Sequence, residues 1–572
     1  MPAGPARIAA FASGAEHAAA LFELIALQLA AAIVERRLLG LLDDAAGAAA
    51  GRLLARIVPT GLSPAPPAKP VGRPPHDSLA LIEHASAAEL DELLAGIARR
   101  AAVFEARVEA ARAQGIALPL ADAFDAWRLS AVDRSILATL LGAACAPAIA
   151  QLLRCAGTAV EGVAAMLAPG HAGVLAVEER LAADAPLARL ALVAVQGVER
   201  PLLQRELVAA PRLAALARGA VELDLALRGV TLQRRRDPLA GGWTAPAAYH
   251  RLRGILARGT PLPVTWIAAP RGGGAGAIAA DIALSLSWNV LHVREAEDDP
   301  AWLAALAREA LLHRAALVVE HGGGPLDPLL RRFASLPIPL VVTDETAGVG
   351  PATALPVLHV ELPPPSVADR EQLWRRSLGA LDRACDLAEL ASALRVGPES
   401  IDRAVAHAKV VAAASGRPIA RADLVAGLRA QLPADLAPFT RPPLPDGVAL
   451  PAGLLDRVID FELTVRERGA AIAVVTGSDR SGKSALAALI ARDLGLDLVE
   501  LDARAEPRAL EAAIAAAEQG LCLLGFDRAD EAPSPWLRRL ERMRGPVVAM
   551  ARAPVGLART VSLALSPPQE PR

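Results

Sequence analysis

An eight-residue stretch in the C-terminal part of the chain has the residue types and spacing of a phosphate-binding loop. Glycines let backbone amides turn toward a phosphate, and the start of a following helix adds its positive end. The ammonium group of Lys483 can reach the β- and γ-phosphates of a nucleotide, and the hydroxyl of Ser484 can bind Mg²⁺. We therefore expect this loop to bind ATP or ADP with Mg²⁺. The stretch fits the pattern GxxxxGK[ST] and reads Gly477, Ser478, Asp479, Arg480, Ser481, Gly482, Lys483 and Ser484.

Lysine is rare in the rest of the sequence. The chain holds 60 basic residues, and the lysines among them are Lys69, Lys409 and Lys483, so nearly every other position uses arginine. A guanidinium is longer and planar, and it is a poor substitute for a compact ammonium inside a ring of backbone amides. Phosphate binding therefore explains why lysine is kept at position 483.

A second candidate residue for the metal follows an apolar run. The stretch LCLLGFDRADEA ends its apolar part at Asp527, which we expect to hold Mg²⁺ together with Ser484. Arg528 comes next, where many ATPases place a glutamate. Asp530 and Glu531 stand three and four residues beyond Asp527, and we expect them to face another direction. No residue is left to activate water, so we assign no catalytic residue and expect slow or absent turnover.

The elements around these residues alternate between strand and helix. From about residue 448 to the end, the apolar runs AIAVVTG, LDLVELD, GLCLLGFD and PVVAMA are separated by helical stretches. A similar rhythm runs from residue 263 to 431, with PVTWIAA, NVLHV, ALVVE, PLVVT and VLHVEL. Such alternation predicts parallel α/β sheets. The expected fold is therefore multidomain, with helical N-terminal regions followed by two α/β P-loop-like modules, of which the first is degenerate.

The first of these two modules lacks the residues of a phosphate site. Its strand PVTWIAA leads into the turn PRGGGAG, where counting from the strand puts Gly276 and Ala277 in place of lysine and serine or threonine. Glu320 at best stands in for the metal-side acid. We expect the glycine-rich turn at 272–276 to keep its fold without a ligand.

Helical periodicity dominates before residue 232. Residues 8–57 predict one long helix or a helical hairpin, and residues 58–76 hold seven prolines and predict an extended linker. Ser130 is expected to cap a helix, the segment 172–197 suggests a small hairpin or wing, and the arginines at 234–236 suggest an exposed linker. The expected domains are a helical segment 1–57, the linker 58–76, a helix 77–116, a helical or winged-helix-like domain 117–232, a degenerate α/β module 245–366, a helical lid 367–432 and a P-loop module 445–572 without a lid.

Composition argues against several classes of function. The net charge is −2 with a pI of about 6.6, and no helix in 117–230 is rich in arginine or lysine, so nucleic acid is not an expected partner. The cysteines at 145, 155, 385 and 522 fit no metal spacing. No basic segment precedes an apolar run near Met1, and the most apolar stretch, residues 24–34, is about half a membrane span. We expect a cytoplasmic protein without membrane insertion.

Several segments resemble the AAA+ superfamily. The loop at 477–484 resembles its Walker A motif, LLGFDRAD its Walker B motif, and GPVVAMARAP its sensor strand, with Arg552 near the sensor position. VELPPPSVADREQLWRRSLG is similar to the start of an AAA+ lid. Together with FDAWRLSAVDRSILATLL, the order of segments resembles bacterial tandem AAA+ proteins with an N-terminal winged helix, found among ATPases that accompany phage-tail-like contractile injection systems. The second module departs from the family because it has no pore loop and no lid.

Three functions remain open from the sequence. The first is a nucleotide-binding pseudoATPase that acts as a scaffold or regulator of a bacterial protein assembly such as a contractile injection system. The second is an active ATPase that remodels or assembles a protein complex. The third is a winged-helix regulator that binds DNA. The resemblance implies protein partners or self-assembly.

Overall fold

The computed structural model divides into two compact units, which are described separately. One holds residues 1–234, 288–317 and 323–340, and the other holds 235–287, 318–322 and 341–572. The structure describes residues 9–42, 49–50, 87–168, 171–235, 246–257, 264–269, 272–321, 326–344, 355–379, 386–432, 439–440, 452–558 and 560–565. The expected proline-rich linker at 58–76 and the expected Pro169-Gly170 turn lie outside these residues.

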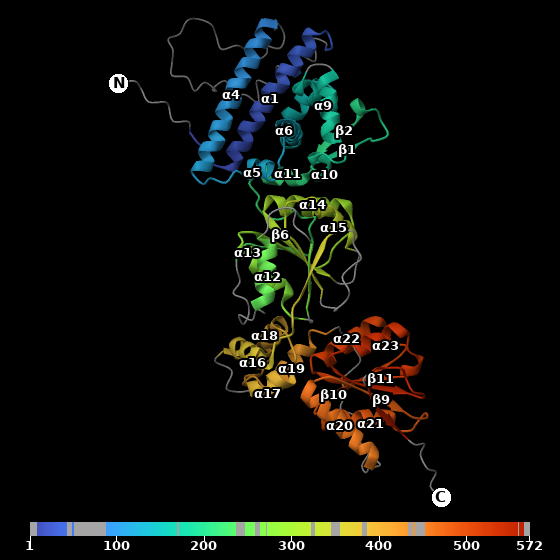
Figure 1. Cartoon of the computed structure of the whole chain (residues 1–572). Helices are drawn as coiled ribbons and strands as arrows, with labels where there is room; N and C mark the ends of the chain where they lie inside the picture. Colours follow the sequence, from blue (N-terminus) through green and yellow to red (C-terminus); the bar gives the residue numbers. More distant parts are fainter. Residues whose placement is uncertain are drawn as a thin grey trace. The chain divides into compact units, whose positions relative to one another are not determined.

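Two long helices begin the described chain. Helix α1 (Gly14–Leu38) packs along α4 (Ala87–Ala113), and Figure 1 shows the two side by side. The sequence predicted that the most apolar stretch, residues 24–34, is about half as long as a membrane span. That prediction was wrong, because α1 is apolar and long enough to cross a membrane by length and composition. Its side chains at Ile25, Leu29 and Ile33 are nevertheless fully buried against the other helices of this unit. This is how the core helix of a globular domain packs.

Short capped helices and one hairpin complete the N-terminal region. Ser130 caps α6 and forms a capping box with Asp133, as predicted from the sequence. The predicted hairpin is also present, because β1 (Val193–Gln196) pairs antiparallel with β2 (Glu206–Ala209). The second strand lies beyond the segment 172–197 that suggested it. The helices are α5 (Pro119–Ala126), α6 (Ala131–Cys145), α7 (Pro147–Cys155), α8 (Ala159–Leu167), α9 (His171–Leu181), α10 (Pro186–Arg189) and α11 (Pro211–Ala217), with the 3-10 turn η1 (Leu202–Gln204).

The middle of the chain forms a six-stranded sheet with the order β3-β5-β6-β7-β4-β8. β4 pairs parallel with β7 and with β8, whereas β3 pairs antiparallel with β5. β3 is an edge strand, and it lies where the helical domain was predicted to end. The arginines at 234 and 235 therefore directly follow an edge strand. The elements are β3 (Val230–Gln233), α12 (Pro246–Leu256), β4 (Val264–Ala268), α13 (Ala275–Ser285), β5 (Asn289–Val293), α14 (Pro300–Leu312), β6 (Ala315–His321), α15 (Asp327–Phe333), β7 (Leu340–Asp344) and β8 (Val357–Glu361).

Four helices follow, within the residues 367–432 that the sequence analysis expected to form a helical lid. They are α16 (Val367–Leu378), α17 (Leu387–Ala393), α18 (Pro398–Ser415) and α19 (Arg421–Arg429). Ser366 caps α16 through a capping box with Asp369. Their buried faces share one hydrophobic cluster with one face of the following sheet. These helices and the last α/β domain therefore pack on a common core.

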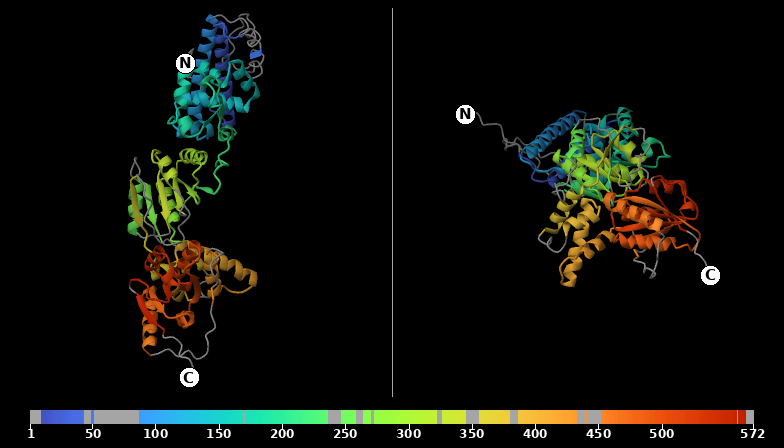
Figure 2. Two further views of the ribbon diagram at one scale, coloured as in Figure 1. Left: turned by 90° about the vertical axis from the view of Figure 1, so that its right-hand side faces the viewer. Right: turned by 60° about the horizontal axis from the view of Figure 1, so that its bottom comes forward.

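The last domain is a parallel five-stranded sheet with the order β10-β11-β12-β9-β13. Neighbouring residues of β9 face opposite sides: Val474 packs in the cluster with α22 and α23, and Val475 in the cluster with α20 and α21. Helices therefore cover both faces (Figure 1, Figure 2). The elements are α20 (Ala452–Arg468), β9 (Ala471–Thr476), α21 (Lys483–Asp493), β10 (Asp497–Asp502), α22 (Pro507–Glu518), β11 (Cys522–Asp527), η4 (Ala529–Glu531), α23 (Ser534–Glu541), β12 (Pro546–Ala551) and β13 (Thr560–Ala564).

Candidate functional site

The loop at 477–484 joins the end of a central strand to the start of a helix. β9 ends at Thr476, and Gly482 caps α21 in the left-handed conformation with φ 91° and ψ 19°. The first helical hydrogen bond runs from Leu486 N–H to Gly482 O at 2.9 Å, so the amides of the first turn have no partner inside the helix. Nothing lies within 4 Å of the position where a Cβ on Gly482 would stand. The loop thus offers exposed amides and open space at a helix start.

Lys483 folds back onto its own loop. Its Nζ donates hydrogen bonds to Gly477 O and Ser478 O, both at 2.9 Å. Ser484 is exposed, and its Oγ lies 3.9 Å from the Met550 sulfur. The Oγ of Ser481 is buried and has no hydrogen-bond partner among the described residues. A cationic head, an exposed hydroxyl and an unsatisfied hydroxyl therefore gather in one turn.

An ion pair closes over the outer part of this loop. Arg552 follows β12, and its Nε and one terminal nitrogen donate to the two carboxylate oxygens of Asp479 at 2.9 and 2.8 Å. The Asp479 carboxylate raises the pKa of Arg552 through these hydrogen bonds and through its charge. The two side chains are 57% and 67% exposed, so water screens the pair and it can open easily. The sequence placed Arg552 near a sensor position but gave no signal that it pairs with the loop.

The predicted metal-side carboxylate lies at the same edge of the sheet. Asp527 ends β11, and β12 separates this strand from β9, whose carboxyl end leads into the loop. Because parallel strands end together, Asp527 and Ser484 belong to one edge of the sheet. Asp502 ends β10 and lies in register with Asp527, so a second carboxylate stands beside the first. This pairing was not predicted.

Arginines occupy the positions around these carboxylates. Arg528 has a left-handed backbone with φ 53°, and its Nε lies 3.6 Å from an Asp502 oxygen. Arg504 donates to Glu531 at 3.0 Å, and the Arg552 amide lies 3.4 Å from an Asp530 oxygen. Glu531 and Asp530 are therefore engaged by arginines 504 and 552.

The middle sheet repeats the architecture of the last one. Without its edge strand β3, it has the order β5-β6-β7-β4-β8, which matches β10-β11-β12-β9-β13 strand for strand. Gly274 caps α13 with φ 75° and ψ 22°, close to the values at Gly482. This alignment puts Ala275 at the place of Lys483 and Gly276 at the place of Ser484. The sequence count to Gly276 and Ala277 was therefore wrong by one residue.

The glycine-rich turn of the middle domain is filled by protein. A Cβ on Gly272 would lie 2.1 Å from Ser400 Oγ, and a Cβ on Gly397 would lie 2.1 Å from Gly272 O. Gly397 caps α18, so the start of this helix packs directly on the turn. A side chain at Gly397 would clash with the Gly272 backbone, and a side chain at Gly272 would clash with the Ser400 side chain. The turn serves packing, and Glu320 lies exposed at the end of β6.

Helix α9 and the β1–β2 hairpin carry few basic side chains. Helix α9 precedes the β1–β2 hairpin and carries Glu178, Glu179 and Arg180. In the hairpin, Glu199 lies 3.7 Å from Arg200. Phosphate contacts require clustered arginine or lysine, and neither element supplies such a cluster. Among the described residues no group of three or more histidine, cysteine, aspartate or glutamate side chains could hold a metal ion.

Comparison with known proteins bears on this N-terminal region. Residues 2–217 match the family model "Winged helix domain, variant". The match includes the helices at 14–38 and 87–113, which the sequence analysis set apart from the winged-helix-like domain at 117–232. No curated protein matches the chain. The chain therefore has a winged helix region at its N-terminus, followed by two α/β domains of the same strand order.

Proposed function

We propose that the last α/β domain binds ATP or ADP with Mg²⁺ and hydrolyses it slowly or not at all. The observation that carries the proposal is the loop at 477–484, where Lys483, an open glycine turn and the start of α21 meet at the carboxyl edge of a parallel sheet. In open α/β sheets ligands bind outside the carboxyl ends of the strands. This site is AAA+-like and has the parts of a pseudoATPase.

The residues present fit a magnesium nucleotide. The amides of residues 477–484 and the Lys483 ammonium would hold the phosphates, and Ser484 and Asp527 would hold Mg²⁺. The buried, unsatisfied Ser481 Oγ supports a ligand in this turn, because buried hydroxyls normally have partners. Bound Mg²⁺ supplies neutralisation of phosphate charge. The chain's own residues supply orientation, and the side chain at 528 is a cation where water activation needs a base.

We further propose that nucleotide binding regulates a scaffold. The winged helix region has an acidic α9, which supports protein partners or self-assembly over nucleic acid. The order of a winged helix and two α/β domains supports a role in a cytoplasmic bacterial assembly such as a contractile injection system. An active ATPase that remodels a complex is the alternative for the same site, and measured turnover separates the two.

The proposal is tested by titrating the full chain with MgATP and MgADP and by following phosphate release. We expect saturable binding of both nucleotides and release far below the roughly 1–100 s⁻¹ that is typical of kinases. Turnover within that range supports the active ATPase instead. Absence of binding for both nucleotides removes the nucleotide proposal.

Replacing Arg528 with glutamate should raise phosphate release. A positioned general base contributes about 10²–10⁴-fold to such reactions, so we expect at least a tenfold increase in the Arg528→Glu variant. Arg504→Glu is the matched control, because it makes the same charge change at an exposed residue of the same sheet edge. Equal release rates in the two variants would mean that a base at 528 is not the missing part.

Neutralising Asp479 should tighten nucleotide binding. Its carboxylate stands in the loop that would surround the phosphates, and like charges about 4 Å apart cost about 1 kcal/mol when water screens them, or roughly fivefold in Kd. We expect Asp479→Asn to lower the Kd for MgATP by that factor. Arg552→Gln should act in the opposite direction, because it leaves the Asp479 charge without its partner. Titration calorimetry at constant ionic strength measures both, and a weaker affinity for Asp479→Asn contradicts the repulsion.

A DNA-binding regulator is a second candidate, favoured by the winged helix match over residues 2–217. Protein–DNA affinity falls steeply with salt because phosphate contacts release counterions. A fluorescence titration with duplex DNA at about 50 and 200 mM salt tests this candidate. Affinity that is salt-dependent and reaches the micromolar range supports it, and we expect none because α9 is acidic.

A further inference from the structure

A large cavity lies at the edge of the last sheet opposite the phosphate-binding loop. Its volume is about 1170 Å³. One wall holds Gly469, Gly495 and Gly520, which belong to the turns before β9, β10 and β11, and thus to the amino ends of these strands. The other wall comes from helices α16, α17 and α19. Because both walls share one hydrophobic cluster, the cavity is a fixed part of this unit.

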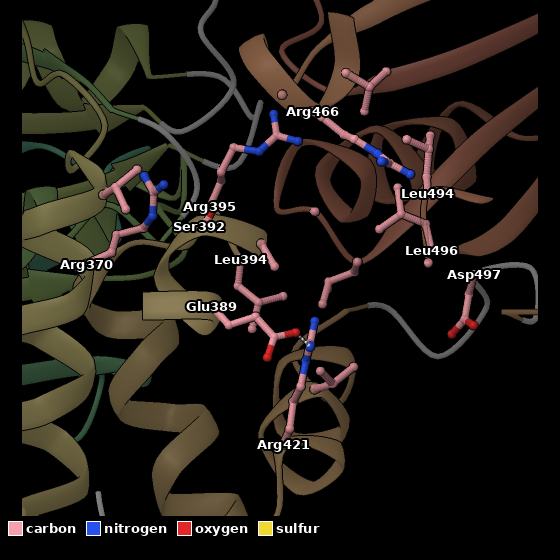
Figure 3. A pocket seen from close by; sticks show the side chains of 18 of the residues that line it. Arg370, Glu389, Ser392, Leu394, Arg395, Arg421, Arg466, Leu494, Leu496 and Asp497 are labelled. Atoms are coloured by element: carbon pink, nitrogen blue, oxygen red, sulfur yellow. Dashed lines mark hydrogen bonds and ion pairs between the residues drawn. The ribbon is translucent and has the colours of Figure 1, made fainter. Parts of the chain in front are cut away.

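Arginines dominate the charge of this cavity. It is lined by six arginines and three acidic residues, and we call it the arginine cavity. Two of its arginines are paired with two of its acids: Arg421 with Glu389 and Arg429 with Asp497. Figure 3 shows the helical wall, and it shows Arg466 on the opposite wall. The arginines are Arg370, Arg395, Arg421, Arg429, Arg466 and Arg468, and the acids are Glu389, Glu467 and Asp497.

Two of these arginines are held by backbone carbonyls. Arg370 is buried and donates to Ala391 O at 2.8 Å and to Pro365 O at 2.6 Å. Arg395 donates from one terminal nitrogen to Arg544 O at 2.9 Å. Neither has a carboxylate within 4 Å among the described residues. Carbonyls satisfy donors but do not neutralise charge, so two positive charges remain near each other in a low-dielectric wall.

The pKa values of Arg370 and Arg395 reflect burial and the charges nearby. Burial lowers the pKa of Arg395, and the charge of Arg370 lowers it further, while the charge of Glu518 raises it in part. Burial also lowers the pKa of Arg370, and the charge of Asp369 raises it in part. A guanidinium that repels its neighbour is stabilised by an anion, and its planar fork matches the oxygens of carboxylates and phosphates. Carboxylates therefore neutralise the positive charge of Arg370 and Arg395 only in part, and their guanidinium groups have the geometry that binds oxyanions.

We infer that the arginine cavity binds a small organic polyanion carrying phosphate or carboxylate groups. Arg370 and Arg395 would contact the anionic groups from the helical wall, with Arg466 and Arg468 on the other wall. The cavity also has apolar lining from Leu394, Val425, Leu494, Leu496 and Leu521, which suits an organic body. Its volume of about 1170 Å³ is somewhat above the range of small-molecule sites, which measure about 300–1000 Å³. This site is separate from the loop at 477–484 and does not depend on nucleotide binding there.

The test uses the full chain with Lys483→Ala, which removes the other candidate anion site. Tripolyphosphate and citrate, titrated by calorimetry at low ionic strength, represent the phosphate and carboxylate sources. We expect one of them to bind at a single site, and Arg395→Gln and Arg468→Gln each to raise its Kd about tenfold or more. Arg492→Gln is the matched control, since Arg492 is exposed on α21 outside the cavity and should leave the Kd unchanged.

Each outcome decides the inference. A Kd that rises in both cavity variants and not in the control supports it, and the anion that binds identifies the source. Absence of binding for both anions overturns it, and so does a Kd unchanged by both cavity substitutions. Should Arg395→Gln fail to fold through loss of its bond to Arg544 O, the exposed Arg468→Gln decides alone. Nucleotide binding by the parent chain is unaffected by any of these results.

Discussion

Lys483→Ala is expected to weaken nucleotide binding roughly a hundredfold. In the proposed site the ammonium group makes charge-assisted contacts with two phosphates, and truncating one partner of such a contact costs about 2–5 kcal/mol. A loss of about 3 kcal/mol weakens binding roughly a hundredfold. Lys483→Arg should weaken binding too, because the planar fork does not fit a cradle that holds an ammonium 2.9 Å from two carbonyls. Titration of MgATP into both variants measures the loss.

A second lysine provides the matched control. Lys409 lies on α18 with its Nζ exposed and donating to Ser377 O at 3.2 Å. Lys409→Ala removes the same atoms and the same charge from the same unit, so it should leave the Kd unchanged. Lys483 is half-buried and its bonds stay within one loop, so the thermal midpoint of Lys483→Ala should move by a few degrees at most. Unchanged nucleotide affinity in Lys483→Ala contradicts the proposed site.

Local sequence patterns predicted the elements of the last domain well. The four apolar runs around Asp527 and Lys483 became β9, β10, β11 and β12, because buried parallel strands are continuous apolar segments. The loop, its glycine cap and the capping box at Ser130 are likewise encoded within a few neighbouring residues. Strand β13, which continues the sheet beside β9, was not predicted, because TVSLA is short and mixes polar with apolar residues.

Long-range pairings could not be predicted in this way. Asp479 and Arg552 are 73 residues apart, and Arg370 comes near Arg395 only through the packing of helices. In a chain with 60 basic and 62 acidic residues, no local rule selects which of them meet. The sequence predicted a glycine-rich turn at 272–276. It did not predict that the start of α18 packs into this turn, because that contact joins residues more than 120 positions apart. Tertiary packing supplies this information.

Glu309→Ala is expected to destabilise the N-terminal unit strongly. Glu309 on α14 is fully buried and accepts hydrogen bonds from Arg212 on α11 at 2.7 and 3.2 Å. His313 lies 3.1 Å from the same carboxylate. The Arg212 side chain is only 4% exposed, so removing the carboxylate leaves a buried charge without a partner. Breaking a buried pair in this way costs about 3–5 kcal/mol. Hydrogen exchange of peptides from α11 and α14 measures the loss locally.

Two comparisons establish that the effect comes from the unpaired charge. Arg212→Met with Glu309→Leu removes both charges at similar volume and should recover most of the loss, because well-packed apolar residues replace buried ion pairs at little or no cost. Asp327→Ala breaks an exposed pair with Arg331 in the same unit and should change stability by less than about 1 kcal/mol. If Glu309→Ala were no more destabilising than Asp327→Ala, the buried pair would contribute nothing to holding α11 on α14. The variant with both Arg212→Met and Glu309→Leu would then have the same stability as Glu309→Ala, so each measurement tests the other.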